Sequence, residues 1–546
     1  MTFSNLFDPL VTTTPDLRRM LESKQITSVQ IVEQYLEQID RYESSLNALA
    51  SIAPRDRLRR TAASLDDERR EGRVRSPLHG IPIVLKVRCA ACSMQIYLGH
   101  LLTAFAYQDA FITAAELGMP TCAGAAVFAG AKACKHGAIV QELLDAGLII
   151  LAKGNMTEFA GMKSAEMMPG WSASGGQTIS PYVGPMMKDE KLLGHSAPGG
   201  SSSGPAVAIA AGFSPLAMGT ETIGSILTPS VRAALYALKP TVGDQEVTGM
   251  YRMTDFFDVP GPMGKCAADI ISLSSILLGR PFNTADMGTW EGLSMASLDP
   301  RVWKMSPAMC DQFDDTEAQM INEYEAAISR IKQQGCAVRF PADISDLSEL
   351  NIDGKDCITP IACKSDLKHI GIPTFIEGFS DAPVTSLEDI VRFNENNKDL
   401  AMPERTKSTL PRHLATRSSF VVSDSLPAFT KQDQLLQALK ATETPEEIAL
   451  LKQKFREKGK SIINDVLNRE NVNLIAAPGD SPMCIHAAAA GYPHITIPLG
   501  KLNYNGRPFG ICVMAGERDE AALLRFMAAY ESISEPRPIP SLVAFP

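Results

Sequence analysis

The stretch Ser196-Ala-Pro-Gly-Gly-Ser-Ser-Ser-Gly204, followed by Gly219-Thr-Glu-Thr-Ile-Gly-Ser-Ile226, says more about the fold than any other part of the chain. Glycines beside serines let the backbone approach a ligand closely and adopt torsion angles that other residues avoid. Upstream, a lysine ends the apolar run Gly80-Ile-Pro-Ile-Val-Leu-Lys86. Serine is a good nucleophile only when a neighbouring group takes its proton, and lysine can do so only in its neutral form. The two stretches and Lys86 together therefore indicate serine-based nucleophilic catalysis.

Two other interpretations of the serine loop fit less well. Gly200-Ser-Ser-Ser-Gly204 matches the nucleophile elbow of α/β-hydrolases, with Ser202 at its centre. That elbow requires a strand directly before it, whereas residues 194–200 are typical of a loop. A phosphate-binding loop requires Gly-Lys-Ser/Thr, but Gly204 is followed by Pro205. Because a single glycine-serine loop is usually only a tight turn, the argument depends on the order and spacing of the whole set.

The whole set resembles the amidase signature family, whose triad is Ser-Ser-Lys. The resemblance places Lys86 on the family's base, Ser201 on its bridging serine and Ser225 on its nucleophile. The 24 residues from Ser201 to Ser225 match the family spacing. The resemblance also implies a cis peptide bond between Gly200 and Ser201. Further matching stretches are 154–159, 170–177, 234–243, 491–500 and 506–510.

The resemblance implies a fold and a set of site residues. The expected fold is α/β, the amidase signature fold, with a large mixed central β-sheet flanked by helices in a single large domain over residues 1–546. Its core motifs fall at about 80–265 and 470–532, and residues 280–465 are expected to form a variable, mainly helical insertion. The oxyanion hole is assigned to the backbone N–H groups of Thr222, Ile223, Gly224 and Ser225. The expected substrate contacts are Gln177, Gly199, Gly200 and Ser202.

The implied activity is hydrolysis of a carboxylic amide through an acyl-enzyme on Ser225, without a metal or an organic cofactor. Two alternatives stay open. The acyl group could pass to an amine or an alcohol, as in a biosynthetic acyltransferase, or the chain could be a catalytically silent homologue that binds a ligand. Ile223 replaces the Gly or Asp that related sequences often have, and Leu227 stands where many have arginine. Both changes bear on the substrate class more than on the reaction type.

Residues 87–108 interrupt the family pattern directly after Lys86. Deleting these 22 residues would join Lys86 to Asp109 and restore a good match. The segment is either a tolerated surface loop or a retained intron, since whole codons keep the frame and Val and Gln codons can begin with GT and end with AG. In either case we expect it to lie outside the central sheet. The fold has no evident slot for its apolar residues, which are Met94, Ile96, Tyr97, Leu101, Leu102 and Phe105.

Composition limits the class of protein. Of the 546 residues, 45% are hydrophobic and 21% charged, an ordinary globular mixture. The net charge of −10 gives no reason to expect nucleic acid or an anionic membrane as partner. The chain has no long apolar run that would predict a membrane span and no secretory signal at its start. The 11 scattered cysteines favour reduced thiols, and Cys89-Ala-Ala-Cys92 lacks a second pair for a metal site. We therefore expect a cytoplasmic protein with a small-molecule amide substrate and leave open a homodimer.

Periodicity of the apolar residues predicts the local elements around the motifs. The predicted strands are 81–85, which places Lys86 at a strand exit, and 148–152. The predicted helix at 27–40 has Thr27 or Ser28 as its cap. Other helices are predicted at 56–71, 138–147, 205–212, 317–334 and 443–469.

Overall fold

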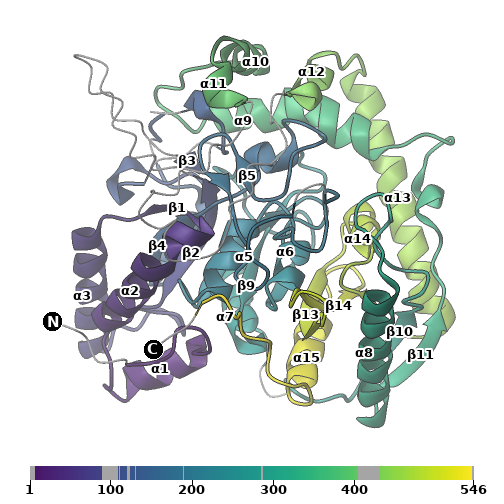
Figure 1. The fold of residues 1–546 in the computed structure, drawn as a ribbon, viewed down its shortest axis with the longest axis horizontal. Coiled ribbons are helices and arrows are strands. Elements are labelled where there is room, and N and C mark those ends of the chain that lie inside the picture. The colour runs from purple at the N-terminus through teal and green to yellow at the C-terminus, as the bar shows by residue number, and fades with distance from the viewer. Residues whose placement is uncertain are drawn as a thin grey trace.

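A mixed β-sheet runs through the molecule, with helices around it (Figure 1). The computed structural model describes residues 6–88, 108–109, 111–119, 123–128, 131–133, 135–187, 190–283, 287–403 and 431–543. Within this part of the chain the sheet has 12 strands. Its order is β1 (Leu49–Ile52), β4 (Ile149–Gly154), β2 (Pro82–Arg88), β7 (Leu216–Glu221), β9 (Val259–Gly264), β8 (Tyr236–Lys239), β13 (His494–Lys501), β14 (Pro508–Ala515), β12 (Leu474–Pro478), β10 (Ser294–Leu298) and β11 (Ala337–Ala342), with β3 (Gln108–Asp109) paired to β2.

Strand directions make the sheet mixed, as predicted. β2 runs parallel to both of its neighbours, β4 and β7, and β10 runs parallel to β11 and β12. The pairs between β7 and β12 along the path are antiparallel. β4, β7, β9 and β14 are buried along their whole length, so the sheet is covered on both faces.

Helices from all parts of the chain cover the sheet. They are α1 (Thr14–Glu22), α2 (Ser28–Leu46), α3 (Arg55–Arg70), α4 (Ala138–Asp145), α5 (Ser203–Ala210), α6 (Leu227–Arg232), α7 (Ala267–Leu277), α8 (Asp314–Gln333), α9 (Ile372–Ile376), α10 (Leu387–Asn396), α11 (Lys398–Ala401), α12 (Asp433–Leu439), α13 (Pro445–Glu470), α14 (Met483–Ala490) and α15 (Glu520–Glu531). In Figure 1, α1 to α3 gather on the left, α9 to α12 lie along the top and α13 runs down the right.

Alternation along β12 shows how the two layers form. Ile475 and Ala477 pack with residues of α13 and α14, whereas Leu474 and Ala476 pack with residues of α8 and α15. Successive side chains of a strand point to opposite faces. The two hydrophobic clusters therefore lie on opposite faces of this part of the sheet.

The predicted helices are present, with small shifts at their ends. The helix predicted at 27–40 is α2, which Thr27 caps through a capping box with Gln30 and which continues to Leu46, where Asn47 ends it in a left-handed conformation. The helix predicted at 443–469 is α13, capped by Thr444. From the segment 280–465, β10 and β11 join the far end of the sheet, and a π-helix at Thr359–Gly371 precedes α9.

One predicted strand end is wrong. Lys86 does not lie at the exit of a strand, because β2 continues through Val87 and Arg88, whose backbones pair with Asp109 and Gln108 of β3. The two ends of the segment 87–108 thus form a short antiparallel ladder next to Lys86. The expectation that the segment lies outside the central sheet is therefore wrong for Val87, Arg88 and Gln108, because strand pairing continues past Lys86. Residues 89–107, with the six apolar side chains discussed above, lie outside the described residues.

Candidate active site

Lys86 is completely buried in β2, and its amine faces two hydroxyl groups. Lys86 Nζ lies 2.8 Å from Ser201 Oγ, 2.7 Å from Thr220 Oγ1 and 3.1 Å from the Thr220 carbonyl oxygen. The parallel pairing of β2 with β7 brings Thr220 alongside the end of β2. The amine therefore has neutral oxygen partners and no carboxylate in hydrogen-bond contact among the described residues.

Burial favours the neutral form of this lysine. Loss of solvation lowers the pKa of Lys86 from 10.5 to about 7, and the negative charges of Asp258 and Glu221 oppose that shift. An amine with a pKa near neutrality is half deprotonated at physiological pH. Lys86 can therefore accept a proton from Ser201 across their 2.8 Å contact.

Two glycines let the serine loop lie directly on α6 and on the turn before it. Gly199 has φ +118°, and a Cβ at this position would lie 2.3 Å from Pro229 Cα. A Cβ on Gly200 would lie 2.9 Å from the Gly224 carbonyl oxygen and 3.1 Å from Ser225 Cα. Only glycine fits such contacts with backbone. The loop thus holds Ser201 between Lys86 and the segment that carries Ser225.

The structure differs at Ser201 from the expected cis peptide and from the contact with Ser225 that its assignment as the bridging serine implies. Gly200–Ser201 is not a cis peptide, since the cis bond found among the described residues is Phe340–Pro341. A trans bond is the ordinary state before any residue other than proline. The described residues also show no hydrogen bond between Ser201 Oγ and Ser225 Oγ. Ser201 Oγ instead accepts from Lys86, and the loop meets the nucleophile turn through Ser202 N–H, which donates to the Ser225 carbonyl oxygen at 3.1 Å.

Ser225 occupies a tight turn between β7 and α6. Gly224 before it has φ +76°, a conformation suited to glycine. The Glu221 carboxylate accepts the N–H groups of Ile226 at 2.7 Å and Leu227 at 2.9 Å, which closes the turn. Burial raises the pKa of Glu221, while these N–H groups and the charge of Lys239 oppose the rise. Leucine at position 227 offers Glu221 no charged partner in place of the arginine that many related sequences have there. Backbone N–H groups hold the carboxylate instead.

The expected oxyanion donors divide into two groups. Within the described residues, the backbone N–H groups of Thr222, Ile223 and Ser225 donate no hydrogen bond to the protein. The Gly224 N–H, by contrast, interacts with the Glu221 carboxylate. Free backbone donors next to a nucleophile can stabilise the negative oxygen of a tetrahedral intermediate. The turn therefore offers such donors at three of the four expected positions.

The expected substrate contacts are engaged with the protein's own backbone. The Gln177 side-chain amide donates to the carbonyl oxygens of Pro169 at 2.7 Å and Thr178 at 3.1 Å. Ser202 is buried, and its hydroxyl donates to the Thr220 carbonyl oxygen at 3.2 Å. Gly199 packs against Pro229, and two of the four expected residues border Ser225: Gly200 lies against its Cα, and the Ser202 N–H donates to its carbonyl oxygen.

Sequence reasoning did not single out Thr220 and Asp258. Thr220 lies inside the quoted Gly219-Thr-Glu-Thr motif, and its hydroxyl contacts Lys86 across 134 residues of sequence. Asp258 precedes β9 and accepts the Met253 N–H at 2.6 Å. Burial raises the pKa of Asp258 to about 6 against the effects of Thr222, Met253 and Lys86. The available signal for Thr220 was a hydroxyl-bearing residue that directly follows the run Leu216–Gly219, which has no polar side chain.

Comparison with known proteins shows the family of the chain. The family model described as Amidase matches residues 30–115 and 112–524. The chain belongs to the amidase family. A putative amidase of Schizosaccharomyces pombe is 26% identical over 95% of this chain and 85% of its own length.

Solved amidase structures share the fold along nearly the whole chain. The native peptide amidase of Stenotrophomonas maltophilia superposes with a TM-score of 0.74 and 25% identity, covering 98% of this chain and 99% of its own. An amidase family protein from Bacillus anthracis superposes with a TM-score of 0.75 and 23% identity over 98% of this chain and 93% of its own. The predicted amidase signature fold is confirmed.

Two further features of the amidase concern membranes and metals. Among the residues that the structure describes, no helix combines the length and apolar character needed to cross a membrane. The same part of the chain contains no cluster of three or more His, Cys, Asp or Glu side chains arranged to hold a metal ion.

Proposed function

We propose that this amidase hydrolyses a small-molecule carboxylic amide through an acyl-enzyme on Ser225, with Ser201 and Lys86 as its proton relay. The observation that carries the proposal is the position of Lys86. Its amine is completely buried, has a pKa lowered to about 7 by burial, and lies 2.8 Å from Ser201 Oγ. A lysine in this state can act as a base at neutral pH.

The proposed reaction has two halves. Lys86 takes the proton of Ser201 while Ser201 takes that of Ser225, and Ser225 Oγ attacks the amide carbonyl carbon. The backbone N–H groups of Thr222, Ile223 and Ser225 hold the resulting oxyanion. Lys86 then returns the proton through Ser201 to the leaving amine, and the C–N bond breaks. Water cleaves the ester on Ser225 by the same relay and releases the acid.

The relay requires one change from the structure described above. Ser201 Oγ and Ser225 Oγ must come within hydrogen-bond distance once the substrate is bound. Catalytic hydrogen bonds are often long in the free enzyme and shorten in the substrate complex. We expect rotation of the two serine side chains to contribute to this change.

A fluorophosphonate probe followed by peptide mapping tests the proposal. We expect a covalent label on Ser225, no label in Ser225→Ala, and a labelling rate reduced by several orders of magnitude in Lys86→Met because Ser201 then has no proton acceptor. Ser201→Ala should be milder than Lys86→Met, since water can replace a hydroxyl relay. Amide turnover by the same variants should follow the same order.

Lys265 supplies a matched control. It is also fully buried, and burial lowers its pKa to about 7, but its amine donates to the carbonyl oxygens of Pro9 and Thr12. Lys265→Met should therefore lower stability and leave labelling of Ser225 unchanged. Near-full activity in Lys86→Met, or a label that maps elsewhere, would show that the assignment is wrong. A wild-type chain that is never labelled would instead favour a silent ligand-binding homologue.

A further inference from the structure

Arg232 ends α6, the helix that begins two residues after Ser225. Its side chain is almost fully buried, and it lies three residues after Pro229, the residue on which Gly199 packs. Residues three apart on a helix share a face. Arg232 therefore extends the surface of α6 on which the serine loop rests.

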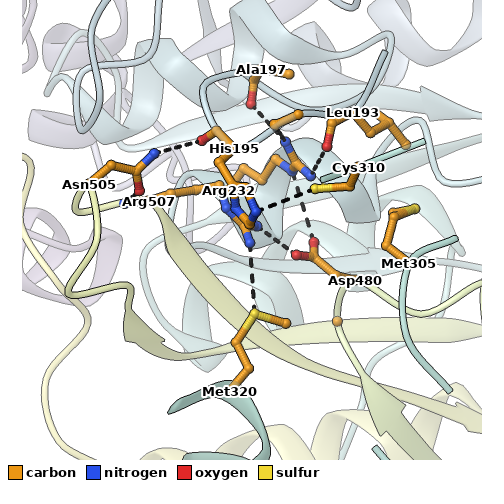
Figure 2. Close-up of polar contacts among 12 residues, drawn as sticks. Leu193, His195, Ala197, Arg232, Met305, Cys310, Met320, Asp480, Asn505 and Arg507 are labelled. Carbon is orange, nitrogen blue, oxygen red and sulfur yellow. Dashed lines mark hydrogen bonds and ion pairs between the residues drawn. The ribbon is translucent and has the colours of Figure 1, made fainter. Parts of the chain in front are cut away.

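The Arg232 guanidinium holds the segment that leads into the serine loop. It donates to the carbonyl oxygens of Leu193 at 2.8 Å and Ala197 at 3.1 Å, and also to that of Gly194 (Figure 2). Residues 193–197 run directly into the loop of Gly199, Gly200 and Ser201. One side chain on the helix after Ser225 thus contacts three backbone carbonyl groups within the five residues 193–197, which precede the serine loop.

An ion pair with Asp480 holds Arg232 in place. Asp480, in the loop between β12 and α14, lies 3.9 Å from Arg232 Nε and accepts from Arg507 Nη1 at 2.6 Å. Burial alone would raise the pKa of Asp480, but the guanidinium groups of Arg507 and Arg232 hold it below its usual value. Figure 2 shows the two arginines converging on this carboxylate. The negative charge of Asp480 thus compensates the charge of Arg232, whose hydrogen bonds to residues 193–197 are kept.

The same loop continues to the other side of the nucleophile turn. Cys484, at the start of α14, lies against Gly224, since a Cβ on Gly224 would be 3.4 Å from Cys484 Sγ. Asp480 therefore connects the serine loop, through Arg232, with the start of α14, and both segments contact the turn of Ser225. A planar guanidinium presents several N–H donors in a fixed arrangement, which a lysine ammonium or an apolar side chain does not reproduce.

We infer that Arg232 is a positioning residue for the proposed reaction: it sets the place of the relay serine Ser201 relative to the nucleophile Ser225, with Asp480 and Arg507 as its support. The inference rests on the proposed function. Arg232 itself does not touch the reacting atoms. Its loss should let the segment 193–197 move away from α6 and carry Ser201 with it, while Lys86 stays in β2.

The test compares Arg232→Met and Arg232→Lys with the wild-type chain, using the rate of fluorophosphonate labelling at Ser225 and the steady-state constants on an amide. A small displacement of reacting groups costs about tenfold to a hundredfold in rate, which we expect for Arg232→Met, with a smaller loss for Arg232→Lys. KM should stay unchanged, since no binding contact is lost. The acid limb of the pH profile should also stay near the pKa of Lys86, about 7, because the surroundings of that amine are not altered.

Arg456→Met is the matched control, measured well below each variant's melting temperature. Arg456 also donates to three carbonyl oxygens, those of Ala488, Ala489 and Phe256, but none belongs to residues 193–204. It should lower the melting temperature without changing the labelling rate. Wild-type labelling in Arg232→Met would overturn the inference alone, and so would failure of both Arg232 variants to fold. Absence of any label on Ser225 in the wild-type chain would overturn the proposed function together with it.

Discussion

Burial alone does not make a lysine suitable for catalysis in this molecule. Lys86, Lys239 and Lys265 are all fully buried, and burial lowers the pKa of each to about 7. Lys239 donates to the Tyr492 carbonyl oxygen and Lys265 to those of Pro9 and Thr12. Of the three, Lys86 is the one whose amine meets a serine hydroxyl, which is the partner that the proposed proton transfer requires.

The first prediction concerns the charge that faces this base. Asp258 favours the ammonium form of Lys86, so Asp258→Asn should lower the pKa of Lys86 further. The rate should then persist to lower pH, with the acid limb of kcat/KM moved down by about one pH unit. Glu221, the other opposing charge, remains in both proteins. A pH profile between about pH 5 and pH 9 on an amide substrate measures the shift, since neutral lysine is the reactive form.

Asp255→Asn is the control for this measurement. Asp255 is half exposed and pairs with Lys452 at 2.7 Å, away from Lys86. It should leave the acid limb where it is. If Asp258→Asn gives the wild-type profile, then Asp258 does not set the protonation of the base.

At the scale of elements, the contact between the serine loop and α6 allows a second prediction. Gly199→Ala would place a Cβ against the backbone of Pro229, which cannot move without moving α6, and would add the strain of a positive φ. Gly335 also has a positive φ, +94°, but open space around it. Gly335→Ala should cost about 1 kcal/mol in unfolding free energy and no activity, whereas Gly199→Ala should lose at least about tenfold in labelling of Ser225. Thermal denaturation measures the loss of stability from backbone strain, and the labelling rate of Ser225 measures displacement of the serine loop. Equal stability and equal labelling rates in the two variants would refute the close contact between Gly199 and Pro229.

The elements and the contacts between them were not equally predictable. α2 and α13 could be read locally, because apolar periodicity and a capping threonine lie within one stretch of sequence. Lys86, Ser201 and Ser225 could be named because each lies in a short motif. The contacts of Lys86 with Thr220 and of Arg232 with residues 193–197 depend on strand register and helix packing, which no local pattern encodes. The cis bond expected at Ser201 came from the resemblance alone, and the structure differs there.

At the scale of the whole molecule, the segment 87–108 allows a third prediction. The pairing of β2 with its neighbours reaches Lys86 without this segment, since Lys86 pairs with Gly154 of β4 and Leu85 with Met218 of β7. Among the described residues, removal would cost the two-residue ladder between β2 and β3. A chain in which Lys86 is joined to Asp109 should therefore be at least as stable as the full chain and more active. Melting temperature and amide turnover of the two chains provide the measurement, and a less stable, inactive shortened chain would show that the segment belongs to the fold.

The three buried lysines also make folding a reaction that releases protons. At about pH 8 the folded chain holds these amines mostly neutral, whereas an unfolded chain holds them charged, since the ordinary pKa of lysine is about 10.4. The unfolded state thus binds more protons, and the free energy of unfolding should rise with pH from about 8 to about 9. Glu43, whose pKa burial raises to about 8, acts in the opposite direction below that window. Calorimetric unfolding in buffers of different ionisation enthalpy would count these protons, so the heat needed to melt the enzyme should depend on the buffer in which it is dissolved.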